Sequence, residues 1–528
     1  MKTFTRKMAL LVLVGLIAWM NGNAQTIING GNVSGKWTKA ESPYQVNGNI
    51  TVAQGTTLEI EPGVTAAFAN GAGLIINGQL LAEGTSDDNI VFTEQVAGAH
   101  WRGLIFSAMG ESESVVKYAS IKYTYYYYSD GWGHYDMNYG GVYITSGTVT
   151  LSNNDISNNS SYAGTGGVYI TGGTVTLSNN TISNNSYRGI NIGGGTVTLS
   201  NNDISNNNGG ISIINSSVVT MRNNTVRNNV YTSSNGGGIY MENSTVDMYN
   251  NIISGNSAIS AGGGVYVNNM IAGIRNNVIS NNKHAVSKSG NGGGISLYNS
   301  SSMIINNTIA YNDAENGGGM YCAAGSSPVV IDNIIYGNTS SLESQVFIND
   351  NNSAPKMLYN LNQCGCLGYA AGVNYNWDAN YDASNFDANP QFVNYALQNY
   401  RLKDTSPCIN AGIEDVTGLG LPSADVDGNI RIYGGRIDIG AYEYGAPTGI
   451  ENVTVQQQLM IYPNPSHDGI FKLATDSNNI NWAVYDMKGM QISKGNTPLV
   501  DLSFFQKGIY VIKVQTGKNI VTGKLVKL

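Results

Sequence analysis

Four side chains of types that can move protons occupy related places in a repeated stretch of this sequence. Arg222, Tyr249 and Arg275 each come just before an Asn pair, and Asp247 lies near Tyr249 in the chain. A polysaccharide lyase could use such an arginine as a base and such a tyrosine as an acid. The same positions suit a solvated outer face on which the alignment is incidental, and the sequence favours this second interpretation. No carboxylate pair typical of glycoside hydrolases is visible.

A tyrosine-rich insert at residues 118–139 could contact a ligand. It reads YASIKYTYYYYSDGWGHYDMNY and holds eight Tyr, one Trp and one His. Aromatic rings of this kind stack on sugar rings. The alternative, which the sequence favours, is that the insert folds down and covers strand edges. The candidate ligand-binding residues are Tyr125, Tyr126, Tyr127, Tyr128, Trp132 and His134.

Three oxygen-bearing side chains alternate in the sequence DVDGN. Asp425, Asp427 and Asn429 have the spacing of ligands in a calcium loop. The distal glutamate of such a loop is absent at the proper distance. A structural calcium ion is therefore one interpretation, and an Asx turn paired with Arg431 or Arg436 is the favoured one. We expect no other cofactor.

The elements that position these residues are encoded by a repeat of roughly 21–30 residues. One half reads GGVYI at Gly140–Ile144, and the other reads TVTLSNNDISNN from Thr148. Two positions before the first Asn of each pair, every repeat has an apolar residue, and the neighbouring positions are mostly polar. The apolar residues are Leu151, Leu177, Leu199, Met221, Met248, Ile274, Ile304 and Val330.

This alternation predicts short strands with one buried face, about three in each repeat. Helical periodicity is absent, so the economical fold is a parallel β-helix, in which each strand pairs with its equivalents in the neighbouring coils. Asn tolerates the left-handed backbone of a sharp corner, and its amide can form a ladder between coils. Gly serves corners where a side chain would clash. The sequence therefore predicts an all-β, right-handed parallel β-helix as the main fold.

The flanks of the repeat extend this solenoid. Residues 49–124 alternate in the same way, and 25–48 are expected to cap the first coil. Residues 385–444 contain DANPQFVN, SPCINAG and DVDGN…DIGAYEYG in this order. They resemble the closing segment of the bacterial β-helix family called choice-of-anchor Q. The resemblance implies final coils and a C-terminal cap, with the coils at 25–345 and the closing part at 346–448, and implies no reaction.

Both ends of the chain look like delivery signals. Residues 1–24 have a basic start, an apolar run too short to span a membrane and small residues before a cut at Gln25, as in a signal peptide. Residues 449–528 contain YPNP, KGIYV and a final KLVKL. They resemble the C-terminal sorting domain of proteins exported by the Bacteroidetes type IX secretion system. That resemblance implies a small antiparallel β-sandwich recognised by the outer-membrane translocon, and a secreted or surface-attached protein.

Cysteine usage fits export but leaves the pairing open. An even number of cysteines in an oxidising compartment allows up to two disulfides. The spacing of the Cys-Gly-Cys sequence could also suit a metal, although no histidines cluster with it. The four residues are Cys322, Cys364, Cys366 and Cys408.

The charge distribution excludes one class of partner. The tail from residue 451 has eight Lys against five acidic residues, and the signal peptide carries +3. Because the whole chain carries −8, residues 25–450 carry −14. An acidic passenger of this kind does not bind nucleic acid by counterion release, and it offers no basic channel for polyanionic sugars.

Two functions remain open. The first, which the sequence favours, is a non-catalytic secreted or surface-attached protein that binds glycans, such as extracellular polysaccharide, or other surfaces in adhesion, through its long wall and the tyrosine-rich insert. The second is a polysaccharide lyase or glycoside hydrolase. The ligand, the oligomeric state and the fate of the sorting domain cannot be deduced from the sequence.

Overall fold

The structure of the chain is a computed structural model. It forms two compact units, Met1–Pro447 and Thr448–Leu528. The signal peptide predicted at 1–24 lies outside the described residues. The described residues are 25–108, 110, 113–125, 127–129, 135–137, 140–161, 165–215, 217–284, 290–447, 461–462, 466, 468–473, 480–486, 490–516 and 519–527.

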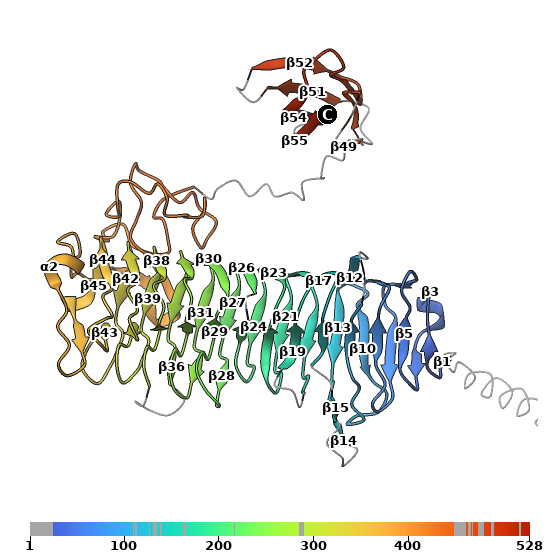
Figure 1. Cartoon of the computed structure of the whole chain (residues 1–528), viewed down its shortest axis with the longest axis horizontal. Coiled ribbons are helices and arrows are strands. Elements are labelled where there is room, and N and C mark those ends of the chain that lie inside the picture. Colours follow the sequence, from blue (N-terminus) through green and yellow to red (C-terminus); the bar gives the residue numbers. More distant parts are fainter. Residues whose placement is uncertain are drawn as a thin grey trace, which may run out of the picture. The chain divides into compact units, whose positions relative to one another are not determined.

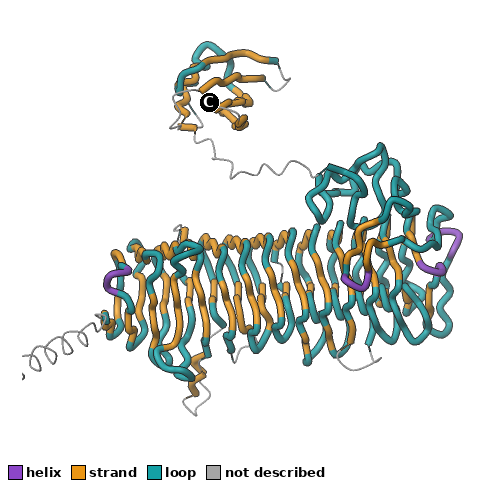
Figure 2. The backbone as a smooth tube through the Cα atoms, turned by 180° about the vertical axis from the view of Figure 1, so that it is seen from behind, coloured by secondary structure: helices purple, strands orange, loops and turns teal. Residues whose placement is uncertain are grey.

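The first unit is a stack of coils with three parallel sheets, which we call walls A, B and C (Figures 1 and 2). Wall A consists of β1 (Thr26–Ile28), β4 (Tyr44–Val46), β7 (Thr65–Phe68), β10 (Ile90–Glu94), β13 (Ala119–Lys122), β18 (Asp155–Ser157), β21 (Thr181–Ser183), β24 (Asp203–Ser205), β27 (Thr225–Arg227), β31 (Ile252–Ser254), β35 (Val278–Ser280), β39 (Thr308–Ala310), β42 (Ile334–Tyr336) and β45 (Leu361–Asn362). Wall B consists of β2 (Gly31–Asn32), β5 (Ile50–Val52), β8 (Leu74–Ile76), β11 (Leu104–Phe106), β16 (Val142–Ile144), β19 (Thr165–Ile170), β22 (Arg188–Ile192), β25 (Ile211–Ile213), β29 (Ile239–Glu242), β33 (Val265–Asn268), β37 (Ile295–Tyr298), β40 (Met320–Ala323), β43 (Val346–Ile348) and β46 (Leu367–Tyr369). Wall C consists of β3 (Gly35–Trp37), β6 (Thr57–Ile60), β9 (Gln79–Glu83), β12 (Glu113–Lys117), β17 (Thr148–Ser152), β20 (Thr174–Ser178), β23 (Thr196–Ser200), β26 (Val218–Arg222), β30 (Thr245–Tyr249), β34 (Gly273–Arg275), β38 (Met303–Ile305), β41 (Val329–Ile331) and β44 (Lys356–Leu358).

The apolar columns of the repeat form the core, as predicted. In β17 the side chains of Val149 and Leu151 are buried while the three residues around them are partly exposed. The same alternation recurs in β20 and β26. The strands pair in parallel and in register, with Leu151 opposite Leu177. The predicted all-β parallel β-helix is therefore confirmed.

The two residues of each Asn pair have different roles: the first forms a corner of the coil, and the second forms a hydrogen-bonded ladder between coils. The first Asn has a left-handed backbone, with φ of 56° at Asn223 for example. The second Asn is buried and bridges coils, because Asn224 Oδ1 accepts from Asn202 Nδ2 at 2.9 Å and Asn224 Nδ2 donates to Asn251 Oδ1 at 3.0 Å. The predicted ladder is confirmed. Its first run comprises Asn154, Asn180, Asn202, Asn224, Asn251, Asn277, Asn307, Asn333, Asn360 and Asn385.

A second ladder follows the next corner of each coil. There Asn207 Nδ2 donates to Asn229 Oδ1 at 3.1 Å and to Ile182 O at 2.9 Å. The two ladders therefore pair buried polar groups that would otherwise be costly to remove from water.

The Gly pairs lie where the backbones of neighbouring coils approach closely, as predicted: a Cβ on Gly167 would lie 2.2 Å from Gly189 O.

Short elements complete the stack. Residues 25–48 form β1, β2 and β3 of the first coil, a 3-10 turn, η1 (Lys39–Glu41), and β4 at the start of the second coil. Near the other end lie η2 (Gln363–Gly365) and α2 (Trp377–Asn380). Two small sheets add to the three walls. In one, β14 (Tyr127–Ser129) pairs antiparallel with β15 (Tyr135–Met137), and in the other, successive coils contribute the parallel strands β28 (Val230–Tyr231), β32 (Ser257–Ala258) and β36 (Lys283–His284).

Residues 388–447, which we call the closing segment, fold back along the side of the last coils (Figure 1). They contain β47 (Phe392–Asn394), η3 (Tyr395–Leu397) and β48 (Asn399–Leu402). A separate hydrophobic cluster joins Phe392 and Tyr400 to Ile334 of wall A. The segment therefore covers an outer face of the coils, and it lies beside them instead of across their open end.

The second unit has antiparallel sheets and its own core. One sheet contains β49 (Ile461–Tyr462), β50 (Ile470–Leu473) and β53 (Leu499–Asp501). The other contains β52 (Gln491–Gly495), β51 (Ile480–Tyr485), β54 (Gly508–Thr516) and β55 (Asn519–Lys527). Phe471, Trp482 and Ile512 are among its buried residues. The small antiparallel unit predicted after the β-helix is thus present.

Candidate functional site

The closing segment is anchored to the coils by a buried ion pair. Arg431 Nη1 lies 2.6 Å from Glu443 Oε2, and both side chains are almost fully buried. Arg431 Nε also donates to Asn276 Oδ1 at 2.8 Å, at a corner of the coils. Asn306 Nδ2 donates to Asp438 O at 2.9 Å. The DVDGN and DIGAYEYG sequences are therefore structural, because their charged residues hold the segment in place.

The loop predicted as a possible calcium site is closed by hydrogen bonds. Asp425 Oδ1 accepts from the backbone of Asp427 and Asn429, at 2.9 and 2.8 Å. Its Oδ2 accepts from Glu443 N at 2.9 Å, and Asp427 pairs with Arg401. Backbone donors thus satisfy both oxygens of Asp425 and Arg401 neutralises Asp427, which is the arrangement of an Asx turn, and the calcium ion stays a prediction. The arginine partner is Arg401, not the Arg431 or Arg436 that the sequence suggested.

Asp332 takes the corner position that is Asn in the seven preceding coils. It is fully buried, with φ of 57°. Its Oδ1 accepts from Ile413 N at 2.8 Å, whereas its Oδ2 has no partner among the described residues. Burial raises the pKa of Asp332 to about 7, although the bond from Ile413 and the charge of Arg431 oppose the shift. A charged Asp332 therefore costs free energy where the closing segment meets the coils.

We expect Asp332→Asn to stabilise the protein at pH 8 and to leave it unchanged near pH 4. Between the unfolded pKa of 3.8 and the folded pKa of about 7, the native state binds more protons than the unfolded state. Stability therefore falls as pH rises through this window, by at most about 4 kcal/mol. Chemical unfolding of both proteins from pH 4 to pH 8 measures the difference. If the free energy of unfolding falls equally with pH in the wild-type protein and in Asp332→Asn, Asp332 does not cause the loss of stability.

Not all residues of the column predicted for catalysis are free to act as an acid or a base. Arg222, Tyr249 and Arg275 are register neighbours in wall C, as predicted. Arg275, however, forms an ion pair with Asp247 and donates from Nε to Leu419 O of the closing segment at 2.9 Å. Arg222 is exposed, and no side-chain partner for it exists among the described residues. The arrangement thus holds Arg275 in place and leaves no acid beside Arg222.

The tyrosine-rich insert is described only in part. Tyr126, Trp132 and His134 lie outside the described residues, whereas Tyr127 and Tyr128 lie in β14, which pairs with β15. Tyr125 donates its backbone N–H to Trp101 O at 3.1 Å, and its ring meets His100 edge-on at 5.6 Å. Its ligand contact remains a prediction.

An aromatic groove lies between the last coils and the closing segment. It has a volume of about 580 Å³, within the range of sites that hold small ligands. The ring of Tyr311 stacks on that of Tyr395 at 5.0 Å, and Tyr336 meets it edge-on at 6.4 Å. We call this the Tyr311 groove, and its lining residues are Tyr311, Tyr336, Gly337, Gln363, Asn389, Gln391, Phe392, Tyr395 and Lys403.

The repeat is broken where this groove forms. Tyr311 stands at the corner that is Asn281 in the preceding coil, and it keeps the left-handed backbone with φ of 57°. Such a conformation is strained for a bulky residue. The next coil has Gly337 at this corner, where a Cβ would lie 2.7 Å from the Tyr311 ring. The two substitutions together place an aromatic ring at a corner that is Asn in five preceding coils, whereas two other coils have Tyr123 and Gly255 there.

Hydrogen-bond donors line the same groove. Gln363 Oε1 accepts from Gly337 N at 2.7 Å, and Gln391 Oε1 accepts from Thr405 Oγ1. Within the described part of the chain, the Nε2 atoms of both glutamines and the Nζ of Lys403 have no partner. The groove thus combines aromatic rings with unused donors.

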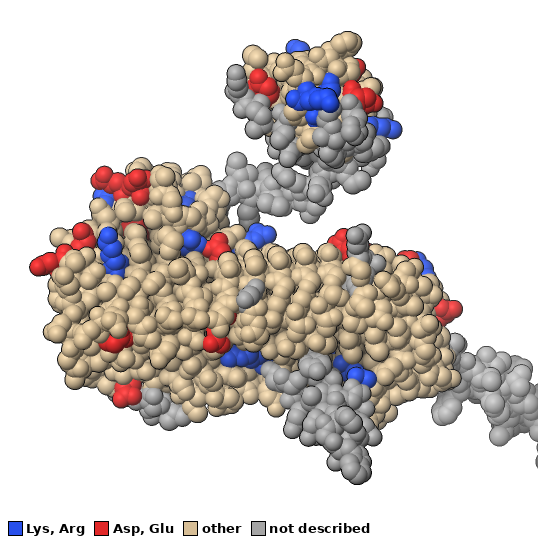
Figure 3. All heavy atoms as spheres, in the orientation of Figure 1, with Lys and Arg blue, Asp and Glu red and all other residues tan. Residues whose placement is uncertain are grey.

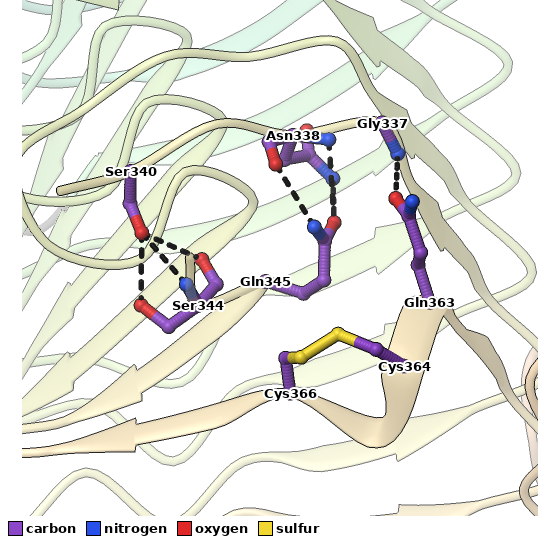
Figure 4. Close-up of a disulfide and its surroundings, with 8 residues drawn as sticks. All are labelled: Gly337, Asn338, Ser340, Ser344, Gln345, Gln363, Cys364 and Cys366. Carbon is purple, nitrogen blue, oxygen red and sulfur yellow. Dashed lines mark hydrogen bonds between the residues drawn. A yellow bond between two sulfur atoms is a disulfide. The ribbon is translucent and has the colours of Figure 1, made fainter. Parts of the chain in front are cut away.

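A disulfide closes the corner that carries Gln363. Cys364 and Cys366 are bonded to each other in and beside η2 (Figure 4). Cys322 and Cys408 are free and buried, and burial raises the pKa of the Cys408 thiol to about 12. No group of three or more His, Cys, Asp or Glu is placed to hold a metal in the described residues. The metal interpretation of the Cys-Gly-Cys sequence therefore has no support.

Charge is concentrated away from most of the coils. Figure 3 shows mostly uncharged atoms over the coils on that face, with acidic and basic side chains gathered over the closing segment. The exposed cation Lys403 belongs to this segment and has no carboxylate partner among the described residues. The groove is therefore a place where a cationic side chain and aromatic rings meet.

The Tyr311 groove was not predicted from the sequence. One signal was present: Tyr311 interrupts a corner column that is Asn at Asn158, Asn184, Asn206, Asn228 and Asn281. The partners Gln391, Tyr395 and Lys403 come from the closing segment, whose fold-back along the coils no periodicity indicates. The sequence could thus have indicated the coil residues of the groove, but not those of the closing segment.

Comparison with known families agrees with both units. Residues 133–269 and 227–388 match the family model described as "Right handed beta helix region". Residues 460–528 match the model described as "Secretion system C-terminal sorting domain". The sorting domain marks a protein exported by the type IX secretion system, to the extracellular space or the cell surface. Among the described residues, no helix has the length and apolar character needed to cross a membrane.

Similarity to individual proteins is limited. The crystal structure of pectate lyase Pel9A matches with 16% identity and a TM-score of 0.40, over 80% of this chain and 97% of that one. Protein bark beetle of Drosophila melanogaster is 45% identical over 64 residues, which are 12% of this chain. The chain thus spans only 2% of the length of that curated relative. Neither likeness carries an argument about activity.

Proposed function

We propose that this protein, a right-handed parallel β-helix with a type IX sorting domain, is an exported protein that binds extracellular glycans without cleaving them. The sorting domain delivers the β-helix to the outside of the cell, where polysaccharides are abundant ligands. The β-helix presents the Tyr311 groove there.

The observation that supports this proposal is the break in the repeat at Tyr311. The Tyr311, Tyr336 and Tyr395 rings meet in one groove, and aromatic rings are favoured surfaces for the apolar faces of sugars. Burial and the neighbouring tyrosines raise the pKa of Tyr311 to about 12, so its hydroxyl stays neutral at physiological pH. A strained backbone at a groove is a common feature of binding sites.

A non-catalytic role is favoured by the state of the proposed acid–base column. Arg275 is held by Asp247 and by Leu419 O, so it is not a free base. Tyr249 and Arg222 follow each other in register without a carboxylate between them. Cleavage of a polysaccharide by the wild-type protein would therefore contradict this role.

We expect Tyr311→Asn to weaken glycan binding strongly without unfolding the protein. Asn occupies this corner in five preceding coils, where it adopts the same backbone conformation, so the substitution restores the commonest residue of the repeat. Affinity electrophoresis of the full chain against a panel of neutral and acidic polysaccharides measures binding. Loss of one stacked ring should weaken the complex at least roughly ten-fold.

The matched control is Tyr359→Asn. Tyr359 also stands at a left-handed corner, with φ of 53°, but it does not line the groove. Retarded migration that persists in Tyr311→Asn would refute the groove as the binding site. The appearance of reducing ends or unsaturated products with the wild-type protein would show instead that it is an enzyme.

A further inference from the structure

We infer that the Tyr311 groove takes a sugar residue that bears a carboxylate, with Lys403 and the amides of Gln363 and Gln391 as its donors. This inference rests on the proposed function, because it names the class of glycan bound at the same groove. Its basis is that the amide and ammonium groups of the lining that are free to bind a ligand are all hydrogen-bond donors.

The free side-chain nitrogens at the groove are donors, and the tyrosine hydroxyls there can donate as well as accept. Gln363 and Gln391 have committed their Oε1 atoms to Gly337 N and to Thr405 Oγ1. Each therefore presents its Nε2 as the remaining polar atom. Asn389 likewise uses its Oδ1 to accept from Gln391 N at 2.8 Å. A ligand that supplies acceptors would satisfy this set, and a carboxylate is the strongest acceptor found on common sugars.

Lys403 supplies the charge. It is exposed, it lines the groove, and no ion pair to it exists within the described residues. Other cations of the closing segment are already engaged, since Arg401 pairs with Asp427 and Arg431 with Glu443. An uncommitted lysine beside stacked rings suits a ligand with one apolar ring face and one negative group.

The backbone supports a fixed arrangement of these groups. Gln391 has φ of 53°, so it shares with Tyr311 a left-handed conformation that non-glycine residues seldom adopt. Gln391 O also accepts from Lys403 N at 3.0 Å, which couples the two donors. The disulfide at Cys364–Cys366 adjoins Gln363. The donors are therefore held on constrained backbone on both sides of the groove.

The charge of the passenger limits the length of the ligand. Residues 25–450 carry −14, which repels a long polyanion. The groove, with its volume of about 580 Å³, has room for a short segment only. The expected ligand is thus one acidic residue, at the end or on a branch of an otherwise neutral glycan.

The test compares acidic trisaccharides with neutral versions of themselves. The probes are trisaccharides that contain a single glucuronic or galacturonic acid residue, and the same molecules after carboxyl reduction. Calorimetric titration of the full chain should show at least one acidic probe bound roughly ten-fold more tightly than its neutral form. Added salt should weaken the acidic complex and leave the neutral one unchanged.

Two variants locate the effect. Lys403→Met should lower the affinity for the acidic probe to that for the neutral one. Lys356→Met, which removes an exposed lysine of β44 outside the groove, should have no effect. Equal affinity for both probes, with loss of both in Tyr311→Asn, would overturn this inference and leave the proposed function intact. Absence of binding to any glycan tested would overturn both.

Discussion

Deletion of residues 460–528 is expected to abolish export of the protein while leaving its β-helix folded. These residues match the sorting-domain model, and they belong to a unit with its own hydrophobic core. The core of the coils is formed by other residues, such as Leu177 and Ile204. Immunoblots of cell fractions from the native host should show the truncated protein inside the envelope and almost none outside.

Two controls make this result interpretable. The full chain with Tyr311→Asn should be exported normally, because the substitution lies in the other unit. The truncated protein, purified from the cells, should give the β-sheet circular dichroism of the intact chain. Truncated protein found outside the cells at the wild-type level would mean that the tail is not the export signal.

Replacement of Asn224 by alanine is expected to destabilise the β-helix severely. The Asn224 side chain accepts from Asn202 N and Nδ2, and it donates to Leu199 O and Asn251 Oδ1. Removal of the amide leaves several buried polar groups unpaired, and each costs about 1–3 kcal/mol. We expect a loss on the order of 4 kcal/mol, measured as a lower midpoint of unfolding in guanidinium chloride.

The neighbouring residue provides the control. Asn223 is exposed and left-handed, and its place suits glycine. Asn223→Gly should therefore change stability by less than about 1 kcal/mol. If both variants unfold at the same denaturant concentration, the ladder is not a major source of stability. The comparison separates the two roles within one Asn pair.

The fold could be predicted because each coil repeats the same physical requirements. The apolar column at Leu151 specifies a buried face, and the Asn pair specifies a corner followed by a ladder. Every coil pairs with its sequence equivalents, so local patterning also fixes the strand register. The separate roles of the two Asn residues were less apparent, since Asn suits both a left-handed corner and a ladder. In the structure Asn223 is left-handed and exposed, whereas Asn224 is buried.

The candidate site could not be predicted in the same way. The column at Arg222 was correctly aligned, but the bond from Arg275 to Leu419 O joins residues 144 positions apart. The Tyr311 groove likewise needs Lys403 and Tyr395 from a segment without repeats. Contacts of this kind depend on tertiary packing of the closing segment, for which the sequence carries no periodic signal.

Hydrogen exchange with and without bound glycan shows whether the Tyr311 groove is the binding site. The full chain is saturated with the tightest oligosaccharide of the panel, and the protection of its amides is mapped by mass spectrometry. Binding in the groove should slow exchange in peptides covering residues 336–338 and 389–403, which contain most of the lining residues. Protection confined to the β26–β30 face around Arg222, or to the insert at 125–137, would contradict it.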